Sequence, residues 1–237
     1  MTEVIDGVLS ELAALGTEQT KKSYQSQGVV EPFYGVPTGA MKPLAKKHKK
    51  DHELALALYD TGNYDAMYLA GMIADPKRMT EPEIEHWMEG AYCNPLSDYV
   101  VSVTLAETDF AQAVADRWIE DDRELYQSAG WSCYTWLLGV KPNDAFDTVK
   151  LHGLLERVEA NVHSAPKRAR YAMNGFLTAL GISYPPLHEE ALRVAHAVGA
   201  VDAGIGETGR KAPLASASIQ KAADAGRLGF KRRNVRC

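Results

Sequence analysis

Glu81-Pro-Glu-Ile-Glu-His-Trp-Met-Glu-Gly-Ala-Tyr92 is the stretch that decides the fold of this chain. Its apolar side chains recur at the i, i+3, i+4, i+7 and i+8 positions that form one face of an α-helix. Similar spacing recurs along most of the chain, whereas no run alternates as a half-buried strand would. The sequence therefore predicts an all-α fold. The residues of this apolar stripe are Ile84, Trp87, Met88, Ala91 and Tyr92.

Small residues in the middle of predicted helices indicate how the helices pack. They occur in segments 68–72, 127–131 and 171–176, where a neighbouring helix can approach closely. Short connections between the helices favour antiparallel neighbours. We interpret the pattern as divergent helical pairs stacked in an α-solenoid, with an irregular all-α globule as the alternative. The predicted division is a solenoid domain at 1–203 and a basic helix and tail at 204–237.

Length and composition exclude several classes of protein. A chain of 237 residues with 46% hydrophobic content can bury a large core. Its apolar runs are too short to span a bilayer, and the amino terminus lacks the pattern of a secretory signal. Three widely spaced cysteines predict neither a disulfide framework nor a zinc site. We expect a cytoplasmic monomer with no membrane partner.

The net charge of −5 hides two basic segments. Residues 21–51 contain seven lysines and two acidic residues, and residues 206–237 contain eight basic and two acidic residues. Local clusters of lysine and arginine favour a polyanion even when the total charge is acidic. A solvated face with a loose tail is the alternative. The residues predicted to contact a phosphate backbone are Lys42, Lys46, Lys47, Lys49, Lys50, Lys231, Arg232, Arg233 and Arg236.

The segment Tyr92-Cys-Asn-Pro-Leu-Ser-Asp-Tyr99 carries the candidate for chemistry. Asn94 is suited to be the N-cap of a helix, and Pro95 to be its first residue. Asp98 then falls in the first turn, where the helix dipole alone stabilises a carboxylate by about 0.3–1 kcal/mol. Tyr92 and Tyr99 flank it and supply rings on which nucleotides can stack.

Several of these segments resemble the AlkD-like DNA alkylation repair family. The resemblance is carried by Tyr34-Gly35-Val36-Pro37 before the lysine-bearing helix, by the segment 118–131, and by the carboxyl-terminal pattern from Lys211 to Cys237. It implies an α-α superhelix of HEAT-like helical-pair repeats that binds double-stranded DNA in a concave basic groove. It also implies that no metal or organic cofactor is needed.

The resemblance further implies an alkylpurine DNA glycosylase. Asp98 matches the family's catalytic aspartate by position, although Asn94 stands where the family has a tryptophan. In that reaction the carboxylate stabilises positive charge on the deoxyribose and orients a water. Tyr24, Tyr92, Tyr99 and Trp131 are the predicted substrate-binding rings. The alternatives are a DNA-binding HEAT-repeat protein without catalysis and a solenoid that binds proteins.

Overall fold

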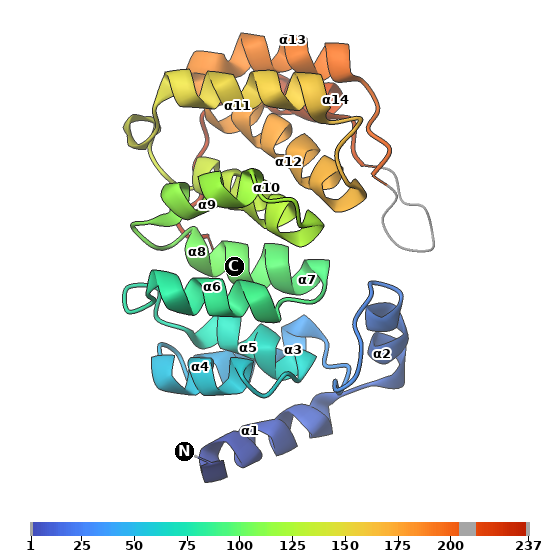
Figure 1. Ribbon diagram of the computed structural model, residues 1–237, viewed down its shortest axis with the longest axis vertical. Helices are drawn as coiled ribbons and strands as arrows, with labels where there is room; N and C mark the ends of the chain where they lie inside the picture. Colours follow the sequence, from blue (N-terminus) through green and yellow to red (C-terminus); the bar gives the residue numbers. More distant parts are fainter. Residues whose placement is uncertain (1, 204–211, 236–237) are drawn as a thin grey trace. The chain divides into compact units, whose positions relative to one another are not determined.

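The computed structural model describes residues 2–203 and 212–235. These residues form helices, turns and loops with no strand among them, which confirms the predicted all-α class (Figure 1). They divide into two compact units, residues 1–110 and 111–237. Within the described ranges, no helix has the length and apolar character needed to cross a bilayer.

The first unit is built from pairs of helices joined by short connections. The break between α4 (His52–Tyr59) and α5 (Tyr64–Ile73) falls at Thr61 and Gly62, and Gly62 has a positive φ of 66°. Helix α5 is the packing centre, because α1, α3, α4, α7 and the π-helical turn all contact it. The elements are α1 (Thr2–Leu15), α2 (Glu18–Gln25), α3 (Thr38–Lys47), α4 (His52–Tyr59), α5 (Tyr64–Ile73), α6 (Glu81–Gly90), α7 (Asn94–Leu96), a π-helical turn (Ser97–Val101) and α8 (Ser102–Leu105).

In the second unit, α10 packs against α9 and α12, and α12 also contacts α13 and α14 (Figure 1). The predicted boundary at residue 204 falls inside this unit. Helix α14 buries Ile219 completely, against Gly181 of α12. The elements are α9 (Ala111–Ile119), α10 (Glu124–Leu138), a 3₁₀ turn (Asn143–Ala145), α11 (Thr148–Asn161), α12 (Lys167–Ser183), a 3₁₀ turn (Pro185–Leu187), α13 (His188–Val198) and α14 (Ala215–Asp224).

Close approach at mid-helix glycines is confirmed at two of the three predicted places. A Cβ on Gly71 of α5 would lie 2.7 Å from the Val100 side chain, so any larger residue would push the π-helical turn away. A Cβ on Gly130 of α10 would lie 2.8 Å from the carbonyl oxygen of Ala115 in α9. At Gly175 the nearest atom is 3.7 Å away, which is ordinary van der Waals contact.

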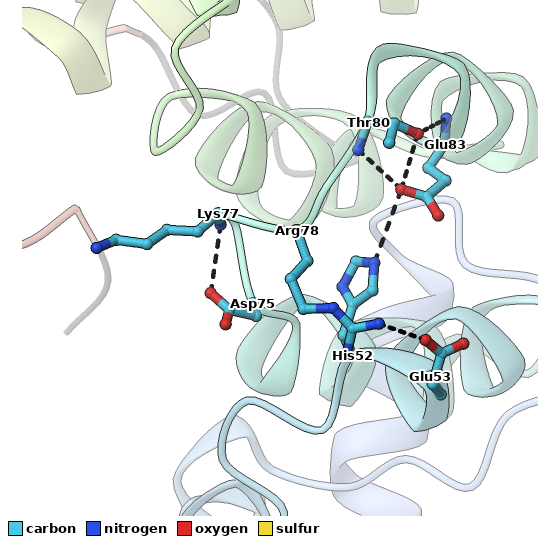
Figure 2. A network of polar contacts seen from close by, with 7 residues as sticks. All are labelled: His52, Glu53, Asp75, Lys77, Arg78, Thr80 and Glu83. Carbon is cyan, nitrogen blue, oxygen red and sulfur yellow. Dashed lines mark hydrogen bonds and ion pairs between the residues drawn. The ribbon is translucent and has the colours of Figure 1, made fainter.

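Polar contacts connect α4 with the start of α6 (Figure 2). Thr80 caps α6, because its hydroxyl accepts from the Glu83 amide while the Glu83 carboxylate accepts from the Thr80 amide at 2.7 Å. The same carboxylate lies 3.7 Å from Nε2 of His52, which is buried in the first turn of α4. Arg78, which precedes the cap, forms an ion pair with Glu53. The His52 and Arg78 contacts thus link α4 to the segment that begins α6.

Asp65 organises the loop that enters α3. Its side chain is fully buried in the first turn of α5 and accepts hydrogen bonds from the backbone N–H groups of Tyr34, Gly35 and Val36. Burial raises the pKa of this carboxyl, and the three N–H donors oppose that rise. The amide of Tyr64 donates in turn to the carbonyl of Pro32 at 3.0 Å. The loop is therefore bound to α5 along residues 32–36.

Replacing Asp65 with asparagine tests this anchor. The new amide group would point N–H donors at backbone N–H donors in a fully buried site, so we expect a loss of about 3 kcal/mol in the free energy of unfolding. Urea unfolding followed by far-ultraviolet circular dichroism measures it. Asp109→Asn makes the same charge change at an exposed position and should stay within about 0.5 kcal/mol of wild type. Equal stability of the two variants would contradict the proposed anchor.

Candidate nucleic-acid interface

Asp98 lies in the π-helical turn Ser97–Val101 rather than in the first turn of a regular helix. Single π-helical turns of this kind often occur at functional sites. The Asp98 side chain is buried, with 4% of its surface exposed. One carboxylate oxygen accepts from Asn94 Nδ2 at 2.6 Å and the other from Ser97 Oγ at 2.9 Å. Both oxygens of the candidate catalytic group are therefore held by neighbours on its own helix.

The prediction that Asn94 is the N-cap is wrong. Cys93 occupies the N-cap position, with extended backbone angles, and Asn94 is the first helical residue. The Asn94 side chain points along the helix to Asp98, so its amide stabilises the carboxylate and not the helix start. Asn94 and Asp98 are four residues apart, a spacing at which side chains meet on one helix face.

A cluster of tyrosines lies where the loop 29–36 meets α5. The ring centroids of Tyr24 and Tyr64 are 4.8 Å apart, and those of Tyr64 and Tyr68 are 6.1 Å apart. Tyr24 donates its hydroxyl to the Val36 carbonyl at 2.6 Å, and Tyr92 donates to the Val30 carbonyl at 3.2 Å. Burial raises the pKa of all four phenols, which keeps them uncharged at neutral pH.

The predicted aromatic residues have different environments. Tyr24 is half-buried, while Tyr92 and Tyr99 are 37% and 45% exposed, so both of the latter offer ring surface. Trp131 is buried in the core of the second unit, 5.1 Å from the Phe176 ring between centroids, and has no face free for a substrate. The candidate surface therefore does not include Trp131.

Sequence reasoning overlooked three members of the first unit's site. Tyr64 and Tyr68 belong to the tyrosine cluster, and Asp65 holds the loop beside it. The i, i+4 spacing of Tyr64 and Tyr68 was available as a signal for the two tyrosines. Asp65 gave no signal, because its partners lie about thirty residues earlier in the chain.

Most of the predicted lysines are exposed and without an ion pair. They lie on α3 and the turn after it, where Lys42, Lys46 and Lys49 follow at helical spacing. Lys47 differs, because its Nζ lies 2.8 Å from Glu11 Oε1. Within the described ranges the other four have no acidic partner, and we call them the lysine surface: Lys42, Lys46, Lys49 and Lys50.

The carboxyl-terminal cations are held against the second unit instead of forming a loose tail. Lys231 Nζ donates to the Leu138 carbonyl at 2.8 Å, and the Arg232 amide donates to the Gly139 carbonyl at the same distance. The Arg232 guanidinium lies over the Trp136 ring, 5.1 Å from its centroid. Arg233 is exposed, and Arg236 lies outside the described residues. Lys231 and Arg232 thus satisfy carbonyls at the end of α10.

The variant Asn94→Asp tests whether Asp98 is charged and held by Asn94. A second carboxylate 2.6 Å from the first would repel it, so we expect a loss of about 2–4 kcal/mol of stability at pH 7. Proton sharing raises the pKa of the pair in the folded state, so the deficit should shrink as the pH falls toward 5. Urea unfolding at both pH values measures it, with the exposed Asn234→Asp as control. An unchanged midpoint for Asn94→Asp at pH 7 would contradict this arrangement.

Comparison with known proteins places these features in a family. Residues 8–218 match the model of a family described as DNA alkylation repair enzyme. Uncharacterised proteins of Listeria innocua and Listeria monocytogenes are each 32% identical over 223 residues, which is 92% of this chain and 96% of each relative.

A solved structure matches over 98% of this chain and 99% of its own length, with 54% identity and a TM-score of 0.90. It is described as a new family of proteins related to the HEAT-like repeat DNA glycosylases with affinity for branched DNA structures. The helical fold of this chain is therefore HEAT-like. Because the family model covers most of the chain and the relatives align over nearly their full length, the chain belongs to the DNA alkylation repair enzyme family.

Proposed function

We propose that this protein binds branched DNA through its phosphate backbone and does so without excising a base. The observation that carries the proposal is the lysine surface, four exposed and unpaired ammonium groups in a chain whose net charge is −5. The solved structure with 54% identity is described as having affinity for branched DNA structures, and this supports branched DNA as the ligand.

The lysine surface suits a phosphate backbone more than a protein partner. Exposed ammonium groups on flexible stems neutralise phosphates wherever the backbone passes, and each contact releases counterions. Lys42 and Lys46 lie at i and i+4 on one face of α3, and Lys49 lies in the turn that follows the helix. A groove for a protein would require a contiguous apolar patch between them. Met41 and Leu44 are buried in the core instead.

The environment of Asp98 supports binding without catalysis. A glycosylase would need its carboxylate to approach the deoxyribose and a water molecule. Here Asn94 and Ser97 occupy one lone pair on each oxygen, and 4% of the side chain is exposed. The resemblance also implies a tryptophan at the position of Asn94, where its ring would line the pocket for the base. Removal of alkylated bases is the second candidate function, favoured by the position of Asp98 in a π-helical turn.

The tyrosines give the first unit an aromatic surface. Tyr92 and Tyr99 keep exposed ring area, and the uncharged phenol of Tyr92 does not repel phosphate. Rings of this kind stack on bases that are not paired or not covered by a neighbouring base. Branch points offer such bases, and their duplex arms offer phosphate for the lysines.

Salt-dependent binding tests the proposal. Fluorescence anisotropy should give tighter binding to a labelled four-way junction than to a linear duplex of the same length, with affinity falling steeply as salt rises. In the triple variant Lys42→Gln, Lys46→Gln, Lys49→Gln, the slope of log K against log salt should decrease by about 2–3, close to one per lost phosphate contact.

Lys47→Gln is the matched control, because it removes the same charge from the same helix but from an ammonium that already pairs with Glu11. We expect a smaller change in slope for this variant. If the triple variant binds the junction with wild-type affinity and slope, the lysine surface does not contact DNA. If the wild-type protein binds neither the junction nor the linear duplex, the proposed function is rejected as a whole.

A further inference from the structure

An exposed aromatic ring lies in the turn that follows α14, far along the chain from the tyrosines of the first unit. Phe230 has 63% of its surface exposed, the largest value for any aromatic side chain among the described residues. We call residues Gly226–Arg233 the C-terminal turn. Phe230 is not part of the buried core of the second unit, and Leu228 of the same turn is 38% exposed.

The backbone of this turn is fixed at both ends. Gly229 donates its N–H to the Ile182 carbonyl at 2.8 Å, at the end of α12. Arg232 donates to the Gly139 carbonyl at 2.8 Å, just after α10. Between them, the Phe230 amide donates to the Arg227 carbonyl at 3.2 Å, which closes the turn. The ring is therefore displayed by an ordered backbone, so little conformational entropy remains to be lost when a ligand binds.

Two glycines give the turn its shape. Gly226 and Gly229 have positive φ values of 65° and 74°, which only glycine adopts readily. A Cβ on Gly229 would also lie 3.1 Å from Pro185 Cγ, because the turn passes directly over the 3₁₀ turn that begins at Pro185. These constraints direct Phe230 away from the unit rather than into it.

Positive charge surrounds the ring along the chain. Arg227 precedes it and Arg233 follows it, and both are exposed. Lys231 and Arg232 add two further cations, although their side chains are directed toward Leu138 and Trp136. The acidic residue of this stretch, Asp224, accepts a hydrogen bond from Gln220 within α14. A flat apolar surface among cations matches a ligand that combines flat faces with negative charge.

We propose that Phe230 is a stacking platform for an unpaired nucleobase of bound DNA, with Arg227 and Arg233 on the adjacent phosphates. The proposal rests on the proposed function and adds to it a site in the second unit. In intact duplex both faces of a base are covered by its neighbours, whereas a gap or a branch point exposes a face. The other exposed large apolar side chain of the turn is Leu228, at 38%, so the flat face that suits a base belongs to the ring of Phe230.

The test uses full-length protein and DNA with 2-aminopurine at an unpaired position in a short gap, whose emission falls when the base stacks. Wild type should quench the emission on binding. Phe230→Ala should abolish the quenching and weaken binding to gapped DNA by about tenfold, within the range of one lost base stack. Its affinity for a fully paired duplex of equal length should not change, and Phe230→Trp should restore both properties.

Val149→Ala is the control, because it truncates another exposed apolar side chain of the same unit, 81% exposed in α11. It should behave as wild type in both assays, and the thermal unfolding midpoints of all variants should agree. Wild-type quenching and affinity in Phe230→Ala would overturn the stacking role while leaving DNA binding in place. No DNA binding by wild type would instead remove the proposed function and this site together. Loss of a dimer in Phe230→Ala on gel filtration would assign the ring to self-association and overturn the proposal.

Discussion

The first unit depends on the buried carboxylate of Asp65. Its three bonds to the backbone of Tyr34, Gly35 and Val36 hold the loop that leads into α3. The Val36 carbonyl in turn receives the Tyr24 hydroxyl, and α3 carries the lysine surface. A single acid in the first turn of α5 thus positions a member of the tyrosine cluster and the start of the cationic helix. A buried charge is tolerated there because several N–H dipoles converge on it.

A second acid in the same unit, Asp98, accepts hydrogen bonds on both carboxylate oxygens from neighbours on its own helix. Asp98 belongs to a turn that widens to π-helical geometry, with Val100 packed against Gly71 of α5. Its oxygens are bonded by Asn94 and Ser97, so the carboxylate stabilises the turn that carries it. Family membership and catalytic capacity are separate properties, because a fold can persist when the chemistry of its site changes. Here the first unit carries exposed lysines on α3 and exposed tyrosine rings at Tyr92 and Tyr99.

The sequence predicted the helices well because their signals are local. The stripe in α6 and the break at Thr61-Gly62 depend on residues within a few turns, and the small residues at Gly71 and Gly130 are visible inside helical segments although the atoms that they approach belong to other elements. The prediction that Asn94 is the N-cap was wrong although its partner is also local. An asparagine before a proline is a good N-cap by local statistics, but here its Nδ2 donates to the Asp98 carboxylate one turn later.

The carboxyl-terminal cations were harder to predict, because their partners are distant in sequence. Nothing near Lys231 indicates that the carbonyl of Leu138, 93 residues earlier, will receive its ammonium group. Charge alone cannot separate a cation that completes a helix end from one that faces solvent. The exposure of Phe230 likewise depends on the hydrogen bonds from Gly229 to Ile182 and from Arg232 to Gly139. The sequence of the tail does not indicate these distant partners.

Base release from methylated DNA under binding conditions tests the central claim most directly. DNA carrying 7-methylguanine and 3-methyladenine is incubated with protein at concentrations where anisotropy reports saturation, and the free bases are quantified against a protein-free control. The account predicts full binding with no more free base than the control, for wild type and for Asp98→Asn alike. Release by wild type well above the control, abolished in Asp98→Asn, would contradict it and make Asp98 a catalytic residue.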